Sequence, residues 1–107
     1  MEEKNLEEIC MQLIAHSGMA KSLYLEALAQ KKEGKAEETQ QLLDQGREAY
    51  IKAHDFHQQL MTFEGTFSSA LEQLLLMHAE DQMMAAENAS ILVNELLSLY
   101  DRLEAQG

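Results

Sequence analysis

One short polar run is a candidate for chemistry, because it interrupts the most apolar part of the chain. The run His-Ala-Glu-Asp-Gln begins at His78 and lies between two apolar blocks, 74–77 and 83–86. On a helix, His78 shares one face with Asp81 three residues later and with Gln82 four residues later. Polar groups in apolar surroundings are costly unless they are paired. These three side chains are therefore the first candidates for a functional site.

Three kinds of chemistry suit this spacing. His78 could be a packed histidine that is hydrogen-bonded to a carboxylate. His78 and Asp81 could supply two ligands to a metal ion, with symmetry copies of the chain completing the set. A neutral imidazole can also act as a nucleophile that takes up a phosphoryl group and passes it on. Spacing alone leaves all three possibilities open.

The elements that hold these residues are predicted to be helices. The chain has 107 residues, no proline and five glycines, and it is rich in strong helix formers. Breaks at Gly34 and Gly65 leave three helical segments, 3–32, 36–62 and 68–105. Short connections favour antiparallel neighbours. We predict one all-α domain over residues 1–107, an antiparallel three-helix bundle with a long third helix.

Apolar residues at spacings of three and four draw one stripe along each of the first two segments. The third segment opens with a possible capping box, Ser69 and Glu72, and is apolar on every side at 74–77 and again at 83–86. A helix that is apolar all round must be covered all round. We therefore predict an oligomer with the third helix at its centre. The alternative is that the methionine-rich patches are exposed.

The charge balance narrows the classes of partner. Nineteen acidic residues face eight basic ones, which gives a net charge of −11. This argues against binding to nucleic acid or to anionic lipid, and favours partners with basic surfaces. The absence of a signal sequence or a long apolar run, and the single cysteine, Cys10, predict a cytoplasmic protein without membrane insertion. We expect Cys10 to be a buried apolar residue, and His16, His54 and His57 to have structural or surface roles.

Three stretches resemble a known family. Leu76–Met84, which reads LMHAEDQMM, is similar to the phosphorylation-site segment of the lactose/cellobiose-type enzyme IIA components of the bacterial phosphoenolpyruvate-dependent sugar phosphotransferase system. Ala15–Ser22 resembles the small-Gly-x-Ala-basic-Ser segment of the first helix in that family, and Ala53-His54 resembles the Ala-His pair of the second. The resemblance covers nearly the whole chain, with matching length and helix number.

The resemblance implies specific roles. His78 aligns with the phosphorylated histidine, and Asp81 with an aspartate that meets its symmetry mates around a structural divalent cation, expected to be Mg²⁺, at the centre of a homotrimer. Gln82 replaces a frequent second histidine, so it can donate a hydrogen bond to a phosphoryl oxygen but carries no charge. Glu80 replaces a common glutamine and adds negative charge. The implied donor is the phosphocarrier HPr, the implied acceptor is a IIB component, and the transfer itself needs no cofactor.

Other functions fit parts of the pattern. Histidine phosphotransfer domains of two-component signalling are also helical bundles, but they usually place Lys and Gly shortly after the histidine, where this chain has Asp81 and Gln82. A non-enzymatic helical adaptor, or a metal-stabilised structural trimer, would have a His78 that is only packed. Replacement of His78 by alanine separates these functions from phosphoryl transfer.

Overall fold

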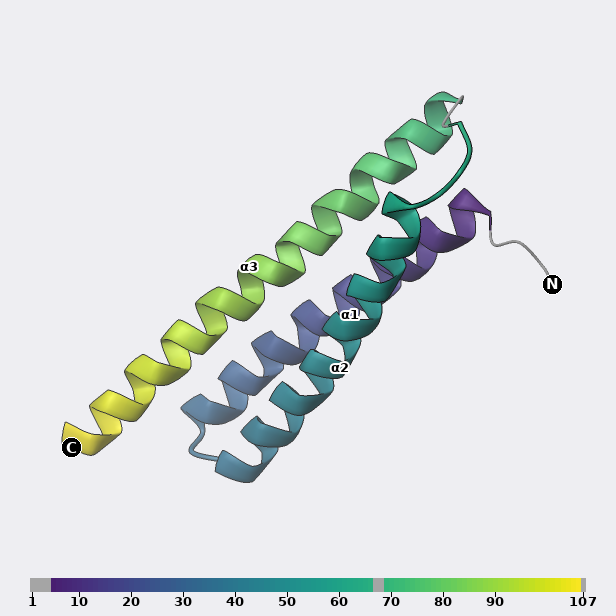
Figure 1. Cartoon of the computed structure of the whole chain (residues 1–107). Coiled ribbons are helices and arrows are strands. Elements are labelled where there is room, and N and C mark those ends of the chain that lie inside the picture. The colour runs from purple at the N-terminus through teal and green to yellow at the C-terminus, as the bar shows by residue number, and fades with distance from the viewer. Residues whose placement is uncertain (1–4, 67–68, 107) are drawn as a thin grey trace.

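The chain folds into three long helices (Figure 1). The structure, a computed structural model, describes residues 5–66 and 69–106, and this part of the chain contains no strand. Helix α1 spans Leu6–Lys32, α2 spans Ala36–Met61 and α3 spans Ala70–Gln106. The predicted all-α class is confirmed. The predicted helix starts at residues 3 and 68 lie outside the described residues.

Local signals fix several of the helix ends. Asn5 caps α1, because its side-chain oxygen accepts a 2.7 Å hydrogen bond from the backbone N–H of Glu8. Gly34 follows α1 with a φ of 77°, the left-handed conformation that glycine adopts at little cost. At the start of α3, Ser69 Oγ accepts from the Glu72 N–H at 3.0 Å, and the Ser69 N–H donates to Glu72 Oε1 at 3.4 Å. The predicted capping box is therefore confirmed.

The helices form an elongated bundle. Figure 1 shows α2 running opposite to α1 and α3, which is the predicted antiparallel order for consecutive helices. The bundle measures 58 × 27 × 17 Å. A helix of 37 residues such as α3 is about 56 Å long at 1.5 Å per residue, so α3 sets the length of the molecule. It packs chiefly on α1 and touches α2 much less.

Small side chains let the helices approach closely in the core. Ala20, Ala53, Ala79 and Ala86 have no exposed surface, and Leu13 is also fully buried. Every residue of the apolar stripes predicted on the first two segments is buried or half-buried: Leu6, Ile9, Leu13, Ile14, Ala20, Leu23, Tyr24, Ala27, Leu28, Leu42, Leu43, Ala49, Tyr50, Ala53, Phe56, Leu60 and Phe63. Close packing of this kind tolerates little change in side-chain volume, so the core holds α3 in one register against α1.

Helix α3 is covered on one side only. Its buried residues are Ala79, Met83, Ala86, Val93 and Leu97, which all face the other two helices. Leu74, Met77 and Met84, in the two blocks predicted to be covered all round, are 59–68 % exposed. One chain therefore cannot cover α3. None of the helices in the described part of the chain is both long and apolar enough to cross a membrane.

Candidate functional site

His78 lies in the third turn of α3, and its side chain is exposed. Asp81 is exposed as well, and Gln82 is half-buried one turn further on. Residues three and four apart on a helix lie on the same face, so the structure brings the three predicted site residues together. The imidazole lies on the surface of the helix, where a reacting partner can reach it.

The surroundings of His78 are apolar on the N-terminal side. Leu71, Leu74 and Leu75 form an open cavity of about 340 Å³ with His78. Leu71 and Leu74 are 66 % and 64 % exposed. An imidazole at the edge of an apolar surface suits contact with a macromolecule, because apolar residues supply contact area and the ring supplies the reacting atom.

Neither ring nitrogen of His78 has a hydrogen-bond partner within the part of one chain that the structure describes. Gln82 also makes no hydrogen bond among these residues. A reactive histidine normally has one nitrogen hydrogen-bonded, which fixes the tautomer. In this protein such a partner must come from outside these residues.

Glu80 lies on another side of the helix from His78. Its two carboxylate oxygens are 2.9 Å and 3.0 Å from Nε2 of His57 on α2. Because an ionised carboxylate only accepts hydrogen bonds, Nε2 of His57 carries the proton. The negative charge expected beside His78 is thus directed towards α2. No pattern in the sequence predicts this pair, because the contact depends on the register of α2 against α3.

A wide exposed apolar face runs along α3, on the side away from the core. At about 100° per residue, most of its members project away from the buried residues of the helix. They are 40–68 % exposed and comprise Leu71, Leu74, Met77, Met84, Ile91, Leu92, Leu96, Leu99 and Leu103. We call this face the α3 ridge. Its extent exceeds the isolated apolar side chains that are normal on a monomer, and is typical of an interface.

The polar residues of the ridge follow a regular spacing. His78 stands seven residues after Leu71, and Asp81 seven residues after Leu74. At the same spacing of seven, the row that begins with Leu74 and Asp81 continues through Asn88, Glu95 and Arg102, which are all exposed. Repeats of seven are typical of helices that pack lengthwise against other helices. His78 and Asp81 therefore lie among the residues of the ridge, whereas Gln82 is half-buried nearer the core.

The predicted metal ligand can be tested against its surroundings. In residues 5–66 and 69–106 of one chain, no group of three or more His, Cys, Asp or Glu side chains could hold a metal ion. Asp81 by itself offers a single carboxylate. Three copies of the chain that meet at Asp81 would provide three carboxylates, and Mg²⁺ prefers such oxygen donors, with water in the remaining positions. The residue fits the predicted ion only in an assembly.

The other histidines and the cysteine lie apart from His78. His16 stacks on Phe56 with ring centroids 5.4 Å apart and planes 7° apart, and its buried Nδ1 has no hydrogen-bond partner in the described chain. His54 is exposed on α2. Cys10 is fully buried, as predicted. Burial raises the pKa of the Cys10 thiol, and the nearby Glu80 charge raises it further, which disfavours the reactive thiolate.

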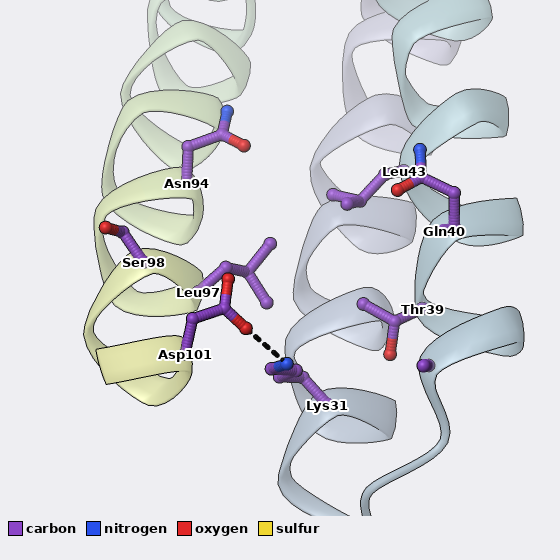
Figure 2. Close-up of a pocket in the computed structure, with 9 residues that line it drawn as sticks. Lys31, Thr39, Gln40, Leu43, Asn94, Leu97, Ser98 and Asp101 are labelled. Carbon is purple, nitrogen blue, oxygen red and sulfur yellow. Dashed lines mark hydrogen bonds and ion pairs between the residues drawn. The ribbon is translucent and has the colours of Figure 1, made fainter. Parts of the chain in front are cut away.

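A second cavity, of about 430 Å³, lies at the opposite end of the bundle and contains no predicted site residue (Figure 2). Lys31 of α1 lines it, together with residues of α2 and α3. Its ammonium lies 2.6 Å from Asp101 and 3.3 Å from Glu104. Figure 2 shows Lys31 pointing towards Asp101. This cation is engaged by two carboxylates, so its role is to tie the ends of α1 and α3 together.

Comparison with known proteins agrees with this geometry. Residues 8–101 match the family model described as PTS system, Lactose/Cellobiose specific IIA subunit. The oligo-beta-mannoside-specific EIIA component of Bacillus subtilis (strain 168) is 39 % identical, over 88 % of this chain and 86 % of the relative. The N,N'-diacetylchitobiose-specific EIIA component of Escherichia coli (strain K12) is 36 % identical, over 97 % and 90 %. No solved structure matches the chain significantly. The chain therefore belongs to the lactose/cellobiose-specific IIA subunit family and is a sugar phosphotransferase-system IIA component.

Proposed function

We propose that this protein is a phosphocarrier whose His78 accepts a phosphoryl group from phospho-HPr and passes it to a IIB component. The observation that carries the proposal is the exposed imidazole of His78, within the family match and beside the apolar residues Leu71 and Leu74. The sugar is a disaccharide of the lactose, cellobiose or chitobiose type. The names of the relatives, which refer to oligo-beta-mannoside and N,N'-diacetylchitobiose, support this class.

The transfer has two steps. In the first, the Nε2 lone pair of His78 attacks phosphorus in line, the N–P bond forms, and the P–N bond to the histidine of HPr breaks. In the second, the cysteine thiolate of IIB attacks the same phosphorus, so that the P–S bond forms and His78 leaves. Positioning and charge stabilisation supply most of the catalysis in such steps. Gln82, one turn after His78, donates a hydrogen bond to a phosphoryl oxygen.

The working form is a homotrimer with the α3 helices at its centre. The α3 ridge supports this assembly, because nine large apolar side chains on one helix are left uncovered by the rest of the chain. Asp81 copies would bind Mg²⁺ on the symmetry axis, where the ion would offset the repulsion between carboxylates. The ion has a structural role and takes no part in the transfer. The relay operates in the cytoplasm, where its donor HPr is found.

The test is a phosphorylation assay followed by intact mass. Phosphoenolpyruvate, enzyme I and HPr are mixed with the parent, with His78→Ala and with His54→Ala. His54 is a matched control, since it is an exposed histidine on another helix. We expect the parent and His54→Ala to gain one acid-labile phosphoryl group, and His78→Ala to gain none.

Two outcomes would contradict the proposal. Labelling of His78→Ala would place the phosphoryl group on another residue. A folded parent that stays unlabelled, while a known family member is labelled in parallel, would favour the non-enzymatic assembly module. The exposed α3 ridge fits such a module as well as it fits a phosphocarrier. The phosphorylation assay, and not the ridge, therefore separates the two functions.

A further inference from the structure

The His57–Glu80 pair links α2 to the turn of α3 that carries His78, and the transfer as proposed does not use it. Nε2 of His57 bonds both oxygens of Glu80, and the two side chains are 23 % and 40 % exposed. It is the only contact within 4.0 Å between a basic or histidine nitrogen and a carboxylate that joins α2 to α3 in the described part of the chain. Helix α3 touches α2 only sparsely, and this link joins the two helices beside the apolar contacts of the core.

The pair determines where the Glu80 carboxylate lies. Glu80 is two residues from His78, which corresponds to about 200° around the helix. With the carboxylate on His57, its charge is roughly 10 Å from the imidazole of His78, by the dimensions of a helix and its side chains. Without this partner, the Glu80 side chain can rotate about three bonds. Its carboxylate can then move several ångströms towards the solvent-facing side of α3.

That placement affects a phosphoryl group on His78. Such a group carries up to two negative charges, and a carboxylate close to it opposes phosphorylation. The repulsion grows as the inverse of the distance. We take an effective dielectric constant between that of a protein surface and that of water. Moving the Glu80 carboxylate from about 10 Å to about 6 Å from the phosphoryl group then lowers the equilibrium constant for phosphorylation of His78 about two- to five-fold.

We propose that His57 is a positioning residue that holds the Glu80 carboxylate against α2, away from the phosphoryl group on His78. This role rests on the proposed function of His78. His57 touches no reacting atom and acts through Glu80 alone. On α1, the Cys10 thiol also feels the Glu80 charge, but the thiol is fully buried and neutral, so it does not compensate that charge.

The experiment compares five variants with the parent: His57→Ala, His57→Gln, Glu80→Gln, Glu80→Asp and the double variant His57→Ala/Glu80→Gln. Each is equilibrated with a fixed ratio of phospho-HPr to HPr, and the phosphorylated fraction is read by intact mass. Circular dichroism and the oligomeric state confirm that each variant is folded and assembled. The readout is the equilibrium constant for phosphorylation, which a merely structural contact would not shift according to charge.

His57→Ala should lower the equilibrium constant about two- to five-fold, whereas His57→Gln retains a donor and should stay near the parent. Glu80→Gln removes the negative charge, so its equilibrium constant should equal or exceed that of the parent. The double variant should have the same equilibrium constant as Glu80→Gln. Glu80→Asp keeps the negative charge, but its shorter side chain cannot reach His57. Its equilibrium constant should therefore be lowered as much as that of His57→Ala.

Two results would overturn the positioning role. One is a His57→Ala constant equal to that of the parent. The other is an equal decrease of the equilibrium constant in His57→Ala and in the double variant. That result would mean that the decrease does not depend on the Glu80 charge. Failure of the parent itself to take up phosphoryl would instead overturn the function proposed for His78, so the two failures are distinguishable.

Discussion

Two glycines inside helices should respond in opposite ways to replacement by alanine. Gly18 lies in α1 and Gly46 in α2. In a helix interior alanine is favoured over glycine by about 0.5–1 kcal/mol. A Cβ atom at Gly18 would meet nothing within 4 Å, whereas one at Gly46 would lie 3.0 Å from Cε1 and 3.1 Å from Cδ1 of Tyr24. Of these two glycines, only Gly46 therefore has a steric reason to be glycine within one chain.

The surroundings of Tyr24 set the size of the effect. Its ring is 5 % exposed and belongs to a cluster with Val93 and Leu97 of α3, so it cannot retreat without moving a second helix. Overpacking of this kind costs about 1–3 kcal/mol. After the gain in helix propensity, Gly46→Ala should be destabilised by about 0.5–2 kcal/mol. Gly18→Ala should be stabilised by up to about 1 kcal/mol.

Thermal unfolding by circular dichroism measures both variants at equal concentration, and sedimentation checks that their oligomeric state is that of the parent. For a domain of this size, 1 kcal/mol shifts Tm by roughly 4–8 °C, so Gly18→Ala should melt well above Gly46→Ala. Tyr24→Leu should reduce the cost of Gly46→Ala in the double variant. Equal Tm values for the two alanine variants, with unchanged assembly, would refute the steric reasoning.

Four further changes test other parts of the structure. Leu13→Ala should lower the free energy of unfolding by about 2–5 kcal/mol in urea titrations, because Leu13 is fully buried. Since burial and Glu80 raise the pKa of Cys10, a thiol reagent at pH 8 should label the native chain at least about ten-fold more slowly than the chain in urea; equal rates would contradict this burial. Leu92→Glu on the α3 ridge should dissociate the proposed trimer in sedimentation velocity, whereas Leu25→Glu, at an exposed leucine of α1, should not. The parent should melt at a higher temperature with Mg²⁺ than with a chelator, and Asp81→Asn should abolish that difference.

Features encoded by neighbouring residues were predictable from the sequence. The Ser69–Glu72 capping box needs residues only three apart, and the φ of 77° at Gly34 follows from its place after a helix. The stripes of α1 and α2 follow from the period of the helix. The grouping of His78, Asp81 and Gln82 on one face was predictable for the same reason.

Features that depend on how the helices meet were not predictable. The contact of Tyr24 with Gly46 and the bond of His57 to Glu80 both depend on the register between helices far apart in sequence. Apolar periodicity also could not tell which side of α3 the first two helices cover. The structure places Ala79 and Ala86 against them and leaves Met77 and Met84 outside.

In the proposed trimer, the position of His78 within the α3 ridge limits how tightly copies of this chain can associate. Apolar substitutions that extended the contact around Leu74 and Met77 would strengthen association, but they would also close solvent access to the imidazole. The proposed association of copies and the access of the proposed phosphoryl donor to His78 therefore oppose each other at this turn of α3. Directed evolution for thermal stability alone should accumulate apolar changes at this turn and lose turnover, whereas changes near Leu99, five to six helical turns away, escape that conflict.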